Sequence, residues 1–216
     1  MPYRRTENVM RRLAARHDAI VAAARDAASE GGMAAVQIVP VAQRAGIAAG
    51  TVYRYFPAKI DLVAALLAEI SKREIGALRH AAAAAPGPLS ALAASIMTFA
   101  ARALRDRRLA FAAIAEPVDA DLDVARLAFR QALAAEFAQR IAAAVKATHL
   151  PQQDAALSAA ALLGLLIEGL IGPLAPDTAG QERAILQSLA LIALRGLGVA
   201  DPRARGLVVQ TVISDR

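Results

Sequence analysis

Residues 41–62 constrain the fold of this chain more than any other stretch. They read as a short helix, a turn, a second short helix and the start of a third. Gly46 stands where the first helix should end, because glycine adopts a left-handed backbone without steric cost. Pro57 lacks an N–H group and restricts the residue before it, so the second helix should close near Phe56. This layout is that of a helix-turn-helix, whose second helix enters the major groove of DNA.

The second helix of this motif separates into two faces at about 100° per residue. The face that should pack inward is apolar and consists of Ala49, Val52 and Phe56. The opposite face is small, polar and basic, and suits a groove lined by phosphates. The alternative is a connector rich in Tyr and Phe between two core helices. The predicted DNA-contacting residues are Gln37, Arg44, Ala49, Gly50, Thr51, Tyr53, Arg54, Tyr55 and Lys59.

The same stretch resembles a known family. Ala45-Gly46-Ile47, followed by the run from Gly50 to Lys59 and then by Leu62, is similar to the DNA-binding signature of TetR-type (TetR/AcrR) transcriptional regulators. The resemblance extends from near Ile20 to about Leu67. It implies an N-terminal three-helix DNA-binding domain, a helical ligand-binding and dimerisation domain, and repression rather than activation.

Three residues depart from the family pattern. Ala48 and Gln37 stand where Ser or Thr usually caps a helix, and Ile60 replaces a common acidic residue. Losing a cap costs about 1 kcal/mol, which weakens the start of a helix without removing it.

Positive charge is concentrated at the N-terminal end. The net charge is +6, and residues 1–60 hold nine basic and four acidic side chains, whereas the rest of the chain is nearly balanced. A basic module joined to a neutral, apolar one suggests a polyanion as partner of the first and a different partner for the second. Residues 1–7 are predicted to form a mobile basic arm, in which Arg4 and Arg5 either contact DNA or are solvated.

Composition favours an all-α protein that is not an enzyme. The chain is 57% hydrophobic, and Ala and Leu, the strongest helix formers, dominate it. It has no Cys, and its three His residues are far apart, so we expect no metal site and no cofactor. No phosphate-binding loop or nucleophile turn is present in the sequence. The N-terminus is polar and shows no signal peptide. Residues 155–175 are apolar, but they include Glu168, whose charge is costly in a bilayer, so a buried helix fits them better than a membrane span. We therefore expect a cytoplasmic protein.

Helical periodicity and Gly or Pro breaks divide the chain. The expected helices cover 8–30, 37–45, 58–85, 89–105, 109–115, 122–149, 154–174 and 180–197. The first should bury an apolar stripe of Leu13, Ile20, Ala24 and Ala27. We predict a DNA-binding domain over 1–57, a regulatory domain built as an antiparallel helical bundle over 58–198, and a C-terminal tail over 199–216 with no assigned docking place.

The helices at 154–174 and 180–197 carry more apolar surface than one chain of this length can bury. Glycines and alanines within them allow a close approach of helices. We therefore predict a two-fold homodimer with a four-helix interface; the alternative is that the pair forms a monomer core. The interface candidates are Leu162, Leu165, Leu166, Gly169, Ile185, Leu189 and Ile192.

Most other large apolar side chains lie in residues 97–137. Large and small side chains alternate there, which can leave an apolar cavity, although a phenylalanine stripe is also ordinary core. Glu116 and Glu168 are polar groups that could orient a ligand, face water or cap a helix. The candidate ligand contacts are Met97, Phe99, Phe111, Ile114, Glu116, Phe129 and Phe137.

These patterns predict a cytoplasmic, homodimeric regulator that binds a double-stranded DNA operator of palindromic sequence. A small, largely apolar effector would release it. Two recognition helices in one dimer must lie about 34–36 Å apart, or a multiple of that distance. Two other functions fit the same sequence: a helical carrier or sequestering protein whose basic end is incidental, and a nonspecific DNA binder without an effector.

Overall fold

The computed structural model describes residues 3–117, 120–177 and 179–211, and every regular element in that part of the chain is helical. The elements are α1 (Tyr3–Gly31), the 3-10 turn η1 (Met33–Ala35), α2 (Ile38–Arg44), α3 (Ala49–Tyr55), α4 (Lys59–Ala83), α5 (Pro88–Arg105), α6 (Arg107–Ile114), α7 (Ala120–Lys146), α8 (Ala155–Leu170), α9 (Glu182–Gly196) and α10 (Asp201–Gln210). The prediction of an all-α fold is confirmed. None of the described helices combines the length and the apolarity needed to cross a bilayer.

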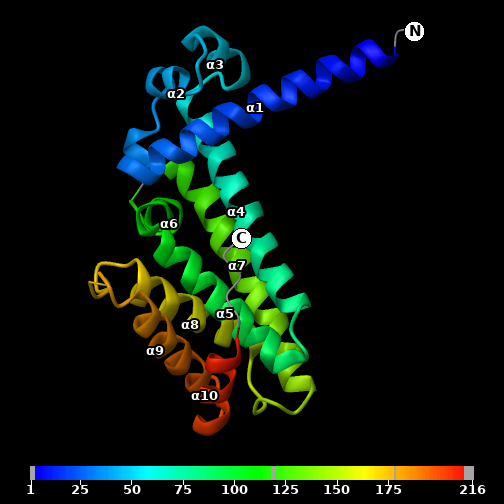
Figure 1. Cartoon of the computed structure of the whole chain (residues 1–216), viewed down its shortest axis with the longest axis vertical. Coiled ribbons are helices and arrows are strands. Elements are labelled where there is room, and N and C mark those ends of the chain that lie inside the picture. The colour runs from blue at the N-terminus through cyan, green and yellow to red at the C-terminus, as the bar shows by residue number, and fades with distance from the viewer. Residues whose placement is uncertain (1–2, 118–119, 178, 212–216) are drawn as a thin grey trace.

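Helices α1 to α3 form one end of the molecule, and the bundle of α5 and α7 to α10 forms the other (Figure 1). The long helix α4 runs from the first group along the bundle, and its bounds agree with the helix expected over 58–85. Helix α6 lies between the groups and packs against α1 on one side and α5 and α7 on the other. One continuous cluster of buried apolar side chains joins both groups. A displacement of α4 or α6 therefore affects the placement of the first three helices.

Helix α1 is longer than predicted. It begins at Tyr3, so residues 3–7 continue the helix and do not form a separate arm. No Gly or Pro interrupts the chain between Tyr3 and Glu30, so nothing in the backbone stops the helix there. Its first half extends past α2 and α3 into open space (Figure 1). Leu13, predicted to be core, is 46% exposed for this reason. The side chains of Arg4 and Arg5 lie outside the described part.

The C-terminal segment is a docked helix, although the sequence predicted a tail. Helix α10 packs against α9 and α5, and it buries Ala204 and Val208 on one face. Two arginines, Arg195 and Arg205, pair with Asp201 at the start of α10, and Arg205 in particular holds the pKa of that carboxyl below its usual range. Residues 212–216, including the apolar pair Val212 and Ile213, lie outside the described residues.

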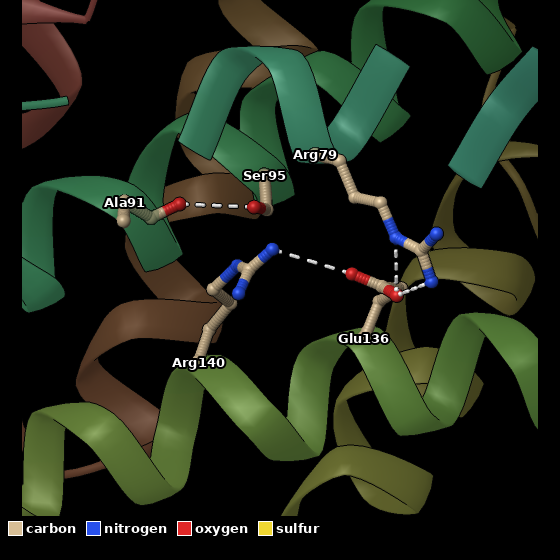
Figure 2. Close-up of polar contacts among 5 residues, drawn as sticks. All are labelled: Arg79, Ala91, Ser95, Glu136 and Arg140. Carbon is tan, nitrogen blue, oxygen red and sulfur yellow. Dashed lines mark hydrogen bonds and ion pairs between the residues drawn. The ribbon is translucent and has the colours of Figure 1, made fainter. Parts of the chain in front are cut away.

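A buried carboxylate joins α4 to α7. Arg79 of α4 donates from Nε (2.8 Å) and Nη2 (2.5 Å) to Oε1 of Glu136, whose other oxygen accepts from Arg140 at 3.3 Å (Figure 2). Glu136 is 7% exposed, so its charge depends on these partners. The Glu136 carboxylate raises the pKa of Arg79. The contact fixes the end of α4 that lies far from α1 to α3.

Candidate functional site

The helix-turn-helix has the geometry that its sequence predicts. Helix α2 ends in a turn in which Gly46 has φ of +66°, the left-handed conformation that favours glycine. The amides of Gly46 and Ile47 donate back to the carbonyls of Gln43 (3.1 Å) and Ala42 (3.0 Å) and close the turn. Helix α3 follows and ends before Pro57. The second helix therefore begins only a few residues after the first ends.

The two faces of α3 also agree with prediction. Val52 and Phe56 are 0% and 4% exposed and face the core, where Phe56 contacts the ring of His17 from α1 at 5.1 Å between centroids. Tyr53 and Arg54 are exposed, and a side chain added at Gly50 would meet no atom within 4 Å. Gly50, Tyr53 and Arg54 thus form an open surface that can approach a flat or grooved partner.

The helix starts differ in how they are capped. Ala48 precedes α3 with extended backbone and no side-chain cap, as its sequence implies. Gln37 precedes α2, and its side-chain amide donates to the backbone carbonyl of Ala34 at 2.9 Å, so this side chain does not cap the helix. Asp61 instead caps α4, because its carboxylate accepts from the amide of Ala58 at 2.9 Å. Lys59 is the first residue of α4 and is exposed beside the end of α3.

Arg44 has a partner that the sequence did not reveal. Its two terminal nitrogens donate to both carboxylate oxygens of Glu30 in α1, at 2.6 and 2.5 Å. This contact lowers the pKa of Glu30 and raises that of Arg44. The pair ties α1 to α2, so Arg44 holds the motif together in addition to its predicted role as a DNA contact.

The other predicted DNA contacts differ in exposure. Thr51 is partly exposed, while Ala49 and Tyr55 are half-buried and pack against the core. Gln37 is exposed at the start of α2. The exposed polar members of the set are Gln37, Arg44, Tyr53, Arg54 and Lys59.

A cavity of about 360 Å³ lies where α1 meets α4, α5, α6 and α7. Phe99, Ile114 and Phe129, three of the predicted ligand contacts, line it. Met97, Phe111 and Phe137 do not line it; Phe137 instead packs edge-on against Phe99 at 6.2 Å within the core. A cavity is present in this region, but half of the six named aromatic and aliphatic residues do not line it.

The cavity wall also contains charged groups that the sequence analysis did not identify. Arg102 donates from Nε and Nη2 to the two oxygens of Glu74, each at 2.7 Å, and this carboxylate raises the pKa of Arg102. Asp106 accepts from the hydroxyl of Ser29 at 2.6 Å and also caps α6. The cavity is therefore apolar inside and polar where α1, α4 and α6 meet.

Glu116, predicted as a ligand contact, has a different place. It does not line the cavity, and its Oε2 accepts from the amide of Met33 at 2.9 Å. Gly32 has φ of +71°, and a Cβ there would lie 2.8 Å from the same oxygen, so glycine is needed for the approach. Glu116 thus links the end of α6 to the turn after α1. Glu168 accepts from the amide of Leu174 at 3.2 Å and so ties the segment after α8 back to that helix.

Removing the Glu116 carboxylate is expected to loosen this link. In Glu116→Ala the Met33 amide loses its acceptor, which costs about 1–2 kcal/mol of local stability. Exchange of that amide with solvent deuterium should accelerate by roughly tenfold. Glu116→Gln keeps an oxygen acceptor and serves as the matched control. Equal exchange rates at Met33 in the wild type and the Ala variant would contradict the link.

The predicted dimer contacts divide into two groups. Leu162 and Leu166 are 4% and 0% exposed within the single chain, so they are core residues and cannot contact a partner. Gly169 and Leu189 face each other, since a Cβ at Gly169 would lie 2.9 Å from a methyl group of Leu189. Leu165 and Ile185 are half-buried, and Ile192 is 52% exposed. Leu162 and Leu166 were assigned to the interface because α8 is apolar on nearly every side. The sequence alone therefore did not separate the side chains of α8 that face the core from those that face outward.

Leu166→Ala is expected to destabilise the chain itself. A fully buried leucine truncated to alanine leaves a cavity and lowers the free energy of unfolding by about 2–5 kcal/mol. Urea denaturation followed by circular dichroism measures this loss. Val209→Ala, at a position 79% exposed on α10, is the control and should change stability by about 0.5 kcal/mol or less. A Leu166→Ala midpoint equal to that of the wild type would contradict the core assignment.

Comparison with known proteins identifies the first module. The family model described as bacterial regulatory proteins, tetR family, matches residues 20–66. The HTH-type transcriptional repressor KstR of Rhodococcus jostii (strain RHA1) is 52% identical over 46 residues, which are 21% of this chain and 22% of that protein. The chain thus matches about a fifth of the length of this curated relative.

Solved structures match the fold over nearly the whole chain. RolR in complex with resorcinol has a TM-score of 0.66 at 19% identity and covers 95% of this chain and 98% of its own. FadR of Bacillus subtilis in complex with stearoyl-CoA has a TM-score of 0.65 at 20% identity, with coverage of 79% and 96%. At these identities the likeness concerns the fold, which agrees with the helical arrangement described above.

Proposed function

We infer the function of this protein from one premise: the chain belongs to the tetR family of bacterial regulatory proteins, a family of DNA-binding transcriptional regulators and not of enzymes. We propose that it is a homodimeric repressor that acts in the cytoplasm on a palindromic operator and is released by a small molecule. The observation that carries the proposal is the open, basic face of α3. Helix α3 is the second helix of a helix-turn-helix, and this motif is joined to a helical bundle that borders a cavity.

DNA recognition would use two kinds of contact. Arg54 lies at the centre of the exposed face of α3, and no ion pair of Arg54 occurs among the described residues, so we assign it to a base edge, with Gly50 allowing close approach. Tyr53 and Lys59 flank it, and we assign them to phosphates. Arg44 is less available, since Glu30 already binds its guanidinium.

Dimerisation would use the face of α8 and α9 that the chain leaves uncovered. Leu157 and Ile192 are 70% and 52% exposed, and Leu165 and Ile185, on the same two helices, are half-buried. Large apolar side chains left exposed on two helices in contact favour burial against a second copy. To bind one palindromic operator, the two recognition helices of this dimer must lie about 34–36 Å apart, or a multiple of that distance.

The effector would occupy the cavity between α1 and the bundle. Two proteins with this fold bind small molecules: RolR binds resorcinol, and FadR of Bacillus subtilis binds stearoyl-CoA. A cavity of about 360 Å³ lies in the size range of small-molecule sites. The effector can release DNA only if it binds the DNA-free arrangement more tightly than the DNA-bound one. Reciprocally, DNA must weaken effector binding by the same factor.

Selection of bound sites from random double-stranded DNA tests the proposal. We expect one enriched palindrome with two half-sites whose centres are about 10 base pairs, or a multiple, apart. A carrier protein would enrich no DNA, and a nonspecific binder would retain DNA without sequence preference. Either result would overturn the repressor assignment.

A further inference from the structure

The cavity is bordered by both modules of the protein. Helix α1 of the DNA-binding module supplies Arg25, Asp26 and Ser29 to its wall, and the other residues come from α4 to α7. A bound molecule would therefore touch the DNA-binding module directly. Its apolar part would meet Phe99, Ile114 and Phe129, which are 2–3% exposed in the single chain.

The wall carries one cation in excess. Four arginines and three carboxylates line the cavity. Each carboxylate already has a donor: Glu74 has Arg102, Asp106 has Ser29 and the Leu109 amide, and Asp26 has Arg25. Arg73 of α4 is exposed, and it makes no ion pair with any residue that the structure describes. An anion at this rim would gain a charge partner without displacing an existing one.

Arg73 is accompanied at the rim by Arg25. Both side chains line this cavity and also a neighbouring hollow of about 570 Å³ between α1 and α4. In the part of the chain that the structure describes, Arg25 makes one long contact, 3.3 Å, to the adjacent Asp26, so its guanidinium keeps further donors for a ligand. Two guanidinium groups from two helices at the mouth of an apolar cavity form a donor set for a carboxylate, sulfonate or phosphate.

We propose that the effector is an anionic amphiphile. Its apolar body lies against Phe99, Ile114 and Phe129, and its acid group binds between Arg25 of α1 and Arg73 of α4. This assignment rests on the proposed function and names the chemical class that the effector site takes. Binding would fix α1 against α4, and so select one angle of the DNA-binding module relative to the bundle.

A matched pair of fluorescent dyes tests the assignment on the full chain without DNA. 1-Anilinonaphthalene-8-sulfonate and N-phenyl-1-naphthylamine share one aromatic body and differ by the sulfonate. The chain has no Trp, so dye emission is measured without interference. We expect the sulfonate dye to bind about tenfold more tightly than the neutral dye, as a charge-assisted contact predicts.

Three variants locate the site. Arg73→Gln and Arg25→Gln should each lower the affinity for the sulfonate dye several-fold and leave that for the neutral dye unchanged. Ala110→Leu, at a partly buried position in the wall, should weaken both dyes. Arg183→Gln, at an exposed position of α9 away from the cavity, is the matched control and should change neither.

The proposal is overturned if the two dyes bind equally, if Arg73→Gln and Arg25→Gln leave their ratio unchanged, or if Ala110→Leu affects neither dye. These measurements contain no DNA, and operator selection contains no dye. Failure of the effector assignment therefore leaves the DNA-binding function standing, and failure of DNA selection does not alter the dye result.

Discussion

Replacement of Ile192 by aspartate is expected to give a folded monomer that binds operator DNA at least about a hundredfold more weakly. Ile192 is 52% exposed in the single chain, so the carboxylate remains hydrated in the monomer. In the proposed dimer the same carboxylate would be buried without a partner, which opposes association. A monomer then loses the second half-site, whose linked binding multiplies affinity.

Val209→Asp is the matched control, because Val209 is 79% exposed on α10, outside the proposed interface. It should remain a dimer with unchanged operator affinity. Analytical ultracentrifugation gives the mass of each variant, and a DNA titration gives its affinity. An Ile192→Asp dimer with normal operator binding would place the interface elsewhere.

The helix-turn-helix was predictable because its determinants are local. The turn needs Gly46 in a left-handed conformation, and Pro57 cannot continue α3; both requirements are visible within residues 41–62. The buried face of α3 follows from helical periodicity alone, and Val52 and Phe56 lie there as expected. The family comparison matches the same part of the chain.

The links between modules were not predictable for the opposite reason. Glu116 and the Met33 amide are 83 residues apart, and Asp106 and Ser29 are 77 apart. Arg44 and Glu30 are closer, at 14 residues, but they lie on two helices whose packing angle no local pattern specifies. Polar pairs of this kind depend on tertiary packing, which the hydrophobic period does not encode.

The surface of α8 and α9 shows a third situation. The sequence indicates more apolar area than one chain can cover, but it does not assign each side chain to the core or to the surface. Leu162 and Leu166 face the core, whereas Ile192 faces outward. Helix α10 packs against α9 and covers part of its apolar surface. The buried positions of α10, Ala204 and Val208, are four residues apart, a helical spacing that was visible in the sequence.

Arg54→Ala is expected to relax base preference, with a loss of about 1–3 kcal/mol on the preferred site. Its guanidinium stands at the centre of the open face of α3, where it can reach a guanine edge with two donors. Alanine removes those donors, so one base position in each half-site should lose its selectivity. Binding to scrambled DNA, which depends on phosphate contacts, should change much less.

Lys59→Ala is the matched comparison, because it removes one exposed charge at the edge of the same surface. A phosphate contact carries no base information, so affinity should fall by a similar factor on operator and scrambled DNA. The slope of log affinity against log salt should become shallower by about one per subunit. Affinities measured over a salt series on both DNAs separate the two classes. The assignment of Arg54 to bases fails if Lys59→Ala alters base preference while Arg54→Ala weakens all sequences equally.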